Sequence, residues 1–202
     1  MIKKKCPICE NDSTNIIYNS NLPKTIDESN YASRKTPDYY HYEMVRCTKC
    51  EILYAKSIYD EVTIEKLYND SDFTYNEEIP GLKLTYEYCL KKAQNFISHK
   101  NSFIDIGCGS GYFISSLHKM KIKNLSGFDP SKEMVDYGNK TNRFKKLEFV
   151  EHDKTIDKIK SISGKDPICL SMIGSMEHIY NQNEILREIK SKKNIKYLYI
   201  VV

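Results

Sequence analysis

The chain has 202 residues, of which 40% are hydrophobic and 29% are charged. This balance excludes an intrinsically disordered chain, and the length suits one full domain together with a small module. The 31 basic and 27 acidic residues leave a net charge of only +4, spread over many short segments, so a nucleic acid is not the favoured partner. We find neither a signal peptide nor an apolar run of about 20 residues, which predicts a cytoplasmic protein without a membrane contact.

Four of the seven cysteines form two C-x-x-C pairs near the N-terminus, Cys6 with Cys9 and Cys47 with Cys50. Four thiolates from two tight turns suit the tetrahedral preference of Zn²⁺, and they leave no open coordination position for catalysis. The alternatives are unligated thiols and a redox dithiol, although a second matching pair has no role in the latter. We therefore predict a zinc-ribbon-like module over residues 1–58 that gains folding energy from a structural Zn²⁺.

Within this module, residues 13–19 and 39–47 are rich in aromatic and β-branched residues and predict two short strands. The polar segment between them contains two prolines and predicts a loop. Glu10 and Glu51 depart from the usual pattern, because zinc knuckles often carry glycine directly after the second cysteine, where the backbone needs a positive φ.

The next segment changes to helical periodicity. Apolar residues recur at intervals of three and four over residues 59–70 and again over residues 81–100. We expect residues 59–99 to form a helical connector that packs on a larger core.

From residue 100 to residue 202, apolar strands alternate with amphipathic helices, which is typical of a doubly wound, mostly parallel Rossmann-like α/β sheet. The expected strands cover residues 102–106, 124–128, 147–150, 167–173 and 195–202, and the expected helices cover residues 111–120, 131–140 and 182–192.

The segment "FIDIGCGSGYF" places Asp105 at the end of the first of these strands and glycines at 107, 109 and 111 in the turn that follows. Gly107, Gly109 and Gly111 permit positive φ and a close approach to the backbone, which lets a nucleotide-like ligand lie at the N-terminus of the next helix. A dinucleotide fingerprint would place its third small residue at position 112, where Tyr112 stands.

The spacing D-x-G-x-G-x-G resembles motif I of the class I S-adenosylmethionine (SAM) dependent methyltransferases, and the resemblance runs from about residue 75 to the C-terminus. It implies SAM as the cofactor, held by Asp105 and the three glycines. It also implies that Asp129 accepts the ribose hydroxyls and that Asp153, which we expect to end the third strand, bonds the adenine amino group. A carboxylate suits a diol because its two oxygens accept two hydrogen bonds.

In this family the loop after the fourth strand lies where methyl donor and acceptor meet, and it carries Glu177 and His178 here. For a hydroxyl or an acidic carbon a base must take a proton, and His178 is the first candidate and Glu177 the second. The alternative is that His178 caps the next helix or bonds the backbone. Tyr75 is a candidate cofactor contact or acceptor contact, although an aromatic residue at helical spacing also suits a core.

A four-cysteine module, a tyrosine-rich stretch and this pattern together resemble zinc-containing methyltransferases that act on nucleotide-linked sugars or other surface-glycan precursors. The resemblance implies a small-molecule acceptor, such as a sugar, a nucleotide-sugar or a surface-polysaccharide precursor. Two rivals remain. A zinc-ribbon RNA methyltransferase would usually carry a Pro-Pro-aromatic motif, which "SMIGSMEH" lacks, and the other rival is a SAM-binding, non-catalytic remnant.

The class I fold ordinarily has seven strands, and this chain stops at "KYLYIVV", which we interpret as the fifth. An apolar strand at an open edge is prone to association. Three alternatives follow: a homodimer contact or partner chain covers the edge, the sequence is C-terminally truncated, or the sheet is smaller than usual.

Overall fold

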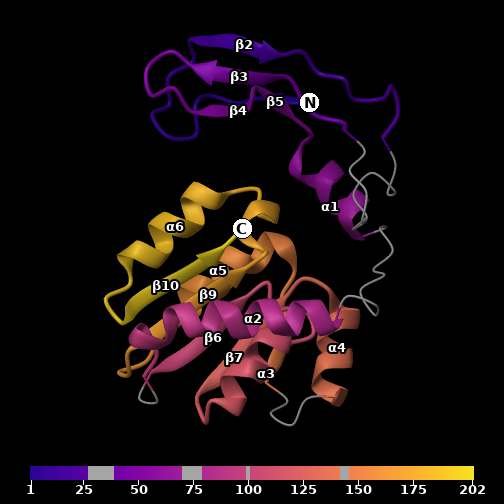
Figure 1. The fold of residues 1–202 in the computed structure, drawn as a ribbon. Coiled ribbons are helices and arrows are strands. Elements are labelled where there is room, and N and C mark those ends of the chain that lie inside the picture. The colour runs from indigo at the N-terminus through magenta and orange to yellow at the C-terminus, as the bar shows by residue number, and fades with distance from the viewer. Residues whose placement is uncertain (27–38, 70–78, 99–100, 142–145) are drawn as a thin grey trace. The chain divides into compact units, whose positions relative to one another are not determined.

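A computed structural model describes residues 1–26, 39–69, 79–98, 101–141 and 146–202 (Figure 1). The chain divides into two compact units, Met1–Thr74 and Tyr75–Val202. The expected connector is therefore shared between them, since helix α1 (Glu61–Asn69) belongs to the first unit and helix α2 (Ile79–Ala93) to the second.

The first unit contains a three-stranded antiparallel sheet in the order β2-β3-β4 and a two-stranded antiparallel sheet of β1 and β5. Both predicted strands are present, although β3 begins only at Met44. The other three strands have two or three residues each, which is too short for a recognisable alternation of apolar and polar residues. The bounds are β1 Ile2–Lys3, β2 Thr14–Tyr18, β3 Met44–Cys47, β4 Leu53–Ala55 and β5 Ser57–Ile58.

The core of the first unit is very small. Its buried apolar cluster consists of Cys6, Val45, Cys47 and Tyr54, with Cys9 packed against it. Three of these five residues are predicted metal ligands, so this unit has little apolar packing apart from its cysteines. A domain of this kind usually needs a metal or another cross-link for stability.

The second unit is built on a five-stranded parallel sheet in the order β10-β9-β6-β7-β8, with β10 at one edge. The predicted Rossmann-like α/β fold is confirmed. The strand bounds are β6 Ser102–Ile106, β7 Leu125–Asp129, β8 Leu147–Phe149, β9 Ile168–Ile173 and β10 Ile195–Val201.

Helices cover both faces of this sheet, with α2, α3 and α4 on one face and α5 and α6 on the other (Figure 1). Successive strand residues alternate between the faces. Phe103 and Cys169 join the apolar cluster beneath the first group of helices, whereas Ile106 and Leu170 join the cluster beneath the second group. The remaining bounds are α3 Tyr112–Lys119, α4 Lys132–Thr141, α5 Thr155–Ser161 and α6 Gln182–Ser191.

Three details differ from the sequence-based expectation. Helix α5 was not predicted, because seven residues offer only two turns of periodicity. Helix α2 ends at Ala93 and is followed by a 3₁₀ turn, η3 (Gln94–Phe96), a common way for an α-helix to finish. Strand β8 ends at Phe149, so Asp153 lies beyond it in the 3₁₀ turn η4 (His152–Lys154).

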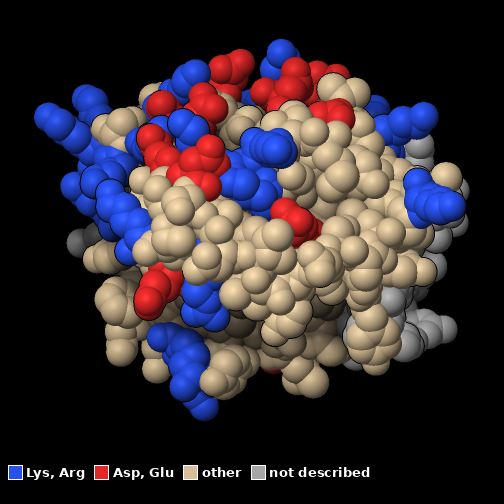
Figure 2. Space-filling model, turned by 90° about the horizontal axis from the view of Figure 1, so that it is seen from above, with Lys and Arg blue, Asp and Glu red and all other residues tan. Residues whose placement is uncertain are grey.

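Cys89, Cys108 and Cys169 are buried in the second unit, where they pack in its apolar interior. On the face drawn in Figure 2, basic and acidic side chains are interspersed among larger areas of other residues. Across the described ranges, no helix combines the length and the apolar character that crossing a bilayer requires.

Candidate functional site

The glycine-rich turn connects β6 to α3 and adopts a left-handed backbone at each of its glycines. The φ angles are 71° at Gly107, 51° at Gly109 and 79° at Gly111, which is also the N-cap of α3. Residues with a Cβ rarely adopt these angles, because the Cβ approaches the following carbonyl oxygen. The glycine spacing therefore corresponds to a backbone requirement at all three positions.

Hydrogen bonds tie this turn to the end of the neighbouring strand β7. The backbone N–H groups of Gly107 and Cys108 donate to the Phe128 carbonyl oxygen at 2.9 and 3.2 Å. The Gly109 N–H donates to Asp129 Oδ2 at 2.7 Å, and Asp129 Oδ1 accepts from the Ser131 N–H at 2.8 Å. Each carboxylate oxygen has further lone-pair capacity, so Asp129 can still accept hydrogen bonds from a ligand.

Asp129 is only 8% exposed. Burial raises its pKa, while the backbone donors Ser131 and Gly109 favour the charged form and oppose the shift. Ser131 also caps α4, because its Oγ accepts from the Met134 N–H at 3.3 Å.

Asp105 lies in β6 and is only 3% exposed. The Ser171 hydroxyl of β9 donates to Asp105 Oδ1 at 2.7 Å. Burial raises the pKa of Asp105 to about 7, the Ser171 hydrogen bond opposes the shift, and the nearby charge of Asp129 adds to it. The two predicted cofactor-site aspartates are therefore close enough for their charges to interact. The Asp105 carboxylate, however, is hydrogen-bonded to Ser171 on the neighbouring strand β9.

The loop after β9 packs directly against the glycine turn. Ser175 is buried, and its hydroxyl donates to the Ile106 carbonyl oxygen at 2.7 Å. A Cβ added at Gly107 would lie 2.5 Å from the Ser175 Cβ, whereas the nearest atom to a Cβ at Gly109 is Met134 Cε at 3.8 Å. A Cβ at Gly107 would therefore clash with Ser175, whereas a Cβ at Gly109 would make only an ordinary van der Waals contact with Met134.

The remaining predicted residues lie in three different settings. Glu177 and His178 are exposed in the 3₁₀ turn η5 (Met176–His178), which begins directly after Ser175. Asp153 is exposed, and its carboxylate lies 3.2 Å from the Lys154 ammonium group. Tyr75 lies outside the described residues.

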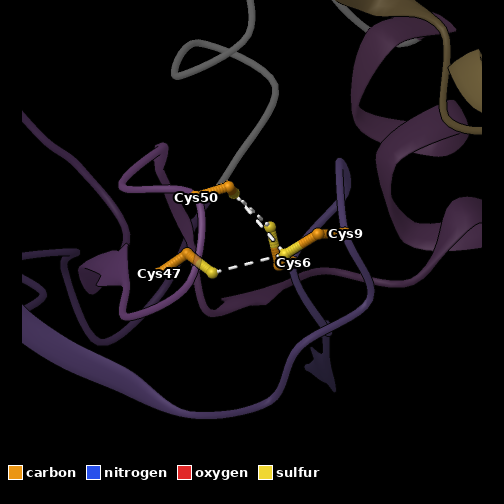
Figure 3. Close-up of side chains that lie close together, drawn as sticks. All are labelled: Cys6, Cys9, Cys47 and Cys50. Carbon is orange, nitrogen blue, oxygen red and sulfur yellow. Dashed lines mark hydrogen bonds between the residues drawn. The ribbon is translucent and has the colours of Figure 1, made fainter.

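The four predicted metal ligands come together in the first unit (Figure 3). Their sulfur atoms all lie within 4.8 Å of one another. Three of the separations are 3.4 Å for Cys6 and Cys50, 3.6 Å for Cys9 and Cys47, and 3.5 Å for Cys9 and Cys50. A tetrahedral ZnS₄ centre with Zn–S bonds of about 2.3 Å places its sulfur atoms about 3.8 Å apart, so this donor set fits Zn²⁺.

Both cysteine pairs adopt the turn of a zinc knuckle despite lacking glycine. Glu10 and Glu51 have φ angles of 60° and 61°, and their N–H groups donate to the carbonyl oxygens of Cys6 and Cys47 at 2.9 and 3.0 Å. Backbone donation by Cys50 and by the residue before it lowers the pKa of the Cys47 thiol to about 6. The lower pKa favours the thiolate, which is the metal-binding form, at Cys47, whereas burial and the neighbouring thiols raise the pKa of Cys50 to about 12.

The sequence reasoning missed two serines at this site, Ser171 and Ser175. In "ICLSMIGS" they interrupt an otherwise apolar strand and the turn that follows it. A buried hydroxyl needs a hydrogen-bond partner, so these positions carried a recognisable signal. Their partners, Asp105 and the Ile106 carbonyl, lie more than 60 residues away and depend on the strand order.

The sequence matches the family described as "Methyltransferase domain" over residues 81–200. The chain belongs to this family. The match covers more than half of the chain and includes the whole glycine turn, Asp129 and the loop after β9. A search of curated proteins gives no match.

Several solved methyltransferases resemble the chain at low identity. The plantazolicin methyltransferase BpumL in complex with SAH has 20% identity and a TM-score of 0.42 over 72% of this chain and 51% of that chain. A SAM-dependent methyltransferase from Anabaena variabilis has 18% identity and a TM-score of 0.43 over 56% and 49%. A possible histamine N-methyltransferase from Thermotoga maritima has 17% identity and a TM-score of 0.44 over 68% and 58%. The chain thus spans about half the length of these proteins.

Proposed function

We propose that this member of the methyltransferase family is a SAM-dependent enzyme that acts on a small-molecule acceptor. The observation that carries the proposal is the turn between β6 and α3, where three glycines adopt positive φ and Asp129 accepts the Gly109 N–H. Bound SAM would supply a methyl carbon that is already electrophilic because it is attached to a sulfonium sulfur.

The chain's own residues would hold this cofactor at the carboxyl ends of β6 and β7. Only Met134 Cε lies within 4 Å of a Cβ built at Gly109, so the backbone there is uncrowded, and the buried Asp129 carboxylate has lone pairs left for the two ribose hydroxyls. Asp153, four residues beyond β8, is exposed and is the proposed partner of the adenine amino group. Tyr75 completes the proposed set.

A base is needed when the acceptor is a hydroxyl or an acidic carbon. We assign this role first to the His178 imidazole and second to the Glu177 carboxylate, which would take the acceptor's proton. Both side chains are exposed, and both follow Ser175, whose hydroxyl fixes the start of their loop to β6. This fixed position favours a defined direction of approach for the acceptor.

For the acceptor we propose a sugar, a nucleotide-sugar or a surface-polysaccharide precursor. This choice comes from the combination of the cysteine module, a tyrosine-rich stretch and the methyltransferase pattern in one chain. It is the class to test first in a transfer assay.

We further propose that Cys6, Cys9, Cys47 and Cys50 bind a structural Zn²⁺. The support is the sulfur cluster, whose separations suit a tetrahedral centre, together with the very small core of the first unit. Four thiolates fill the coordination sphere, so the role of the ion would be to stabilise the fold.

Isothermal titration with SAH, the demethylated product, tests the cofactor site. Asp129→Asn keeps the side-chain shape but removes the charge and one acceptor, so SAH should bind roughly 10- to 100-fold more weakly. Asp136→Asn is the matched control, because Asp136 is an exposed residue on α4 that pairs with Lys132. Equal SAH affinity in wild type and Asp129→Asn, with both folded by circular dichroism, would contradict the proposed site.

Transfer itself is tested with SAM carrying a labelled methyl group and a panel of sugars and nucleotide-sugars. Label in a product, lost in His178→Ala while SAH affinity is retained, would support both the acceptor class and the base. SAH binding without transfer to any member of the panel would favour the non-catalytic alternative.

A further inference from the structure

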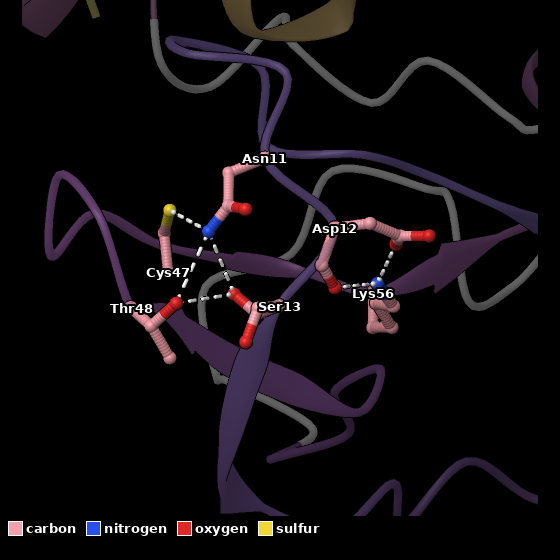
Figure 4. A network of polar contacts seen from close by, with 6 residues as sticks. All are labelled: Asn11, Asp12, Ser13, Cys47, Thr48 and Lys56. Carbon is pink, nitrogen blue, oxygen red and sulfur yellow. Dashed lines mark hydrogen bonds and ion pairs between the residues drawn. The ribbon is translucent and has the colours of Figure 1, made fainter.

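Asn11 lies two residues after Cys9, and its side chain reaches across to the second cysteine pair (Figure 4). Its Nδ2 donates to Cys47 Sγ at 3.6 Å, to Thr48 Oγ1 at 3.1 Å and to the Ser13 carbonyl oxygen at 3.1 Å. Its own carbonyl oxygen accepts from the Cys6 N–H at 3.0 Å. One residue therefore contacts a predicted ligand from each pair, Cys6 through its backbone and Cys47 through its side chain.

Such a donor matters at Cys47, which together with Cys6 is the most buried of the four ligands. Cys47 is 1% exposed, so water cannot solvate its thiolate, and its charge must be balanced by a metal and by hydrogen-bond donors. The Lys49 N–H approaches Cys47 Sγ at 3.4 Å from within the same pair. Asn11 adds a side-chain donor from the other pair, which constrains the direction in which the sulfur lone pairs point.

We propose that Asn11 is a positioning residue of the cysteine site, which holds Cys47 Sγ in place for the metal by the Nδ2–H···Sγ hydrogen bond. The inference rests on the proposed Zn²⁺ site. Residues that orient metal ligands in this way typically change metal affinity by 10- to 100-fold when they are replaced.

A purely structural role is the competing explanation, because the same amide also links Ser13 to Thr48. Thr48 donates through its hydroxyl to the Ser13 carbonyl oxygen at 3.1 Å and accepts from Asn11. Thr48→Val removes both of these bonds but leaves the Asn11 contact with Cys47. It is therefore the matched control for variants of Asn11.

The first measurement is Zn²⁺ affinity of the full chain by competition with a chelating dye. Asn11→Leu, of similar size but without a donor, should bind Zn²⁺ at least about 10-fold more weakly, whereas Thr48→Val should stay within about twofold of wild type. Asn11→Asp lacks the donor and adds a negative charge, so it should weaken binding at least as much. It also provides a second variant if Asn11→Leu does not fold.

The second measurement uses Co²⁺ in place of Zn²⁺ and records the sulfur-to-metal charge-transfer band. A hydrogen bond withdraws electron density from sulfur, so its loss should shift this band to longer wavelength in both Asn11 variants and leave it unchanged in Thr48→Val. A merely structural link would not produce this pattern.

The outcomes separate the two proposals. If wild type binds neither Zn²⁺ nor Co²⁺, the metal site is wrong and the role of Asn11 is overturned with it. If wild type binds both ions, and the Asn11 variants match wild type or match Thr48→Val in affinity and band position, only the role of Asn11 is overturned.

Discussion

Replacing Gly107 with alanine tests the packing of the glycine turn against the loop after β9. At a φ of 71°, any side chain costs roughly 1–2 kcal/mol. The new Cβ would also lie 2.5 Å from the Ser175 Cβ, so Ser175 must move and release the Ile106 carbonyl, a loss of about 1–3 kcal/mol for a buried acceptor. We expect Gly107→Ala to lower the free energy of unfolding by about 2–5 kcal/mol.

Gly109→Ala is the matched control. Its φ of 51° carries a similar backbone cost, but the nearest atom to its Cβ is Met134 Cε at 3.8 Å. We therefore expect a loss of only about 1–2 kcal/mol. Urea unfolding followed by far-UV circular dichroism measures both variants, with amide exchange in β6 and β9 identifying the transition of the second unit.

A double-mutant cycle with Ser175→Gly isolates the clash. Ser175→Gly removes the Cβ that the new methyl group would meet, so Gly107→Ala should cost about 1–3 kcal/mol less in that background than in wild type. Gly109→Ala and Ser175→Gly should be additive. Equal losses for the two alanine variants, or additivity of Gly107→Ala with Ser175→Gly, would refute the reasoning.

Three further predictions concern pH, backbone strain and metal. The pKa of Asp105 is about 7 in the folded chain and 3.8 ordinarily, so between about pH 4 and pH 7 the folded state binds a proton that the unfolded state has lost, and stability falls as the pH rises. Asp105→Asn should therefore reduce the slope of unfolding free energy against pH, measured in urea melts, by up to about 1.4 kcal/mol per pH unit. An unchanged slope would contradict the assignment. Glu10→Gly and Glu51→Gly should each raise the melting temperature of the metal-loaded first unit by relieving roughly 1 kcal/mol of left-handed strain, whereas Lys49→Gly, outside the positive-φ positions, should lower it. EDTA should abolish amide-exchange protection in the first unit and spare the parallel sheet; retained protection would argue against a structural metal.

The fold of the second unit was predictable because its strands are apolar and its helices have clear periodicity. Every expected strand from residue 102 onward is present within two residues of its predicted limits. Helix α5 was not predicted, because Ile156 and Ile159 give only one repeat of the three-residue apolar spacing of a helix. The two- and three-residue strands of the first unit were not predicted for a different reason. In that unit the informative pattern was the spacing of the cysteines, not an alternation of apolar and polar residues.

The candidate site was predictable where a single backbone feature determines the residue type. The glycines of the turn correspond to positive φ, and Ser131 corresponds to a helix N-cap. Asp153 shows the limit of this reasoning, because its assignment depended on where β8 ends. The strand stops four residues earlier, at Phe149.

Asp105 and Asp129 show how the same residue type at two strand ends acquires different properties. Asp129 receives two backbone N–H bonds, which favour its charged form and leave lone pairs free. Asp105 receives one hydroxyl bond within the sheet, and burial with a neighbouring negative charge raises its pKa to about 7. The two aspartates therefore differ in their contacts: Asp129 keeps lone pairs that a ligand hydroxyl could use, and Asp105 links β6 to β9 through Ser171.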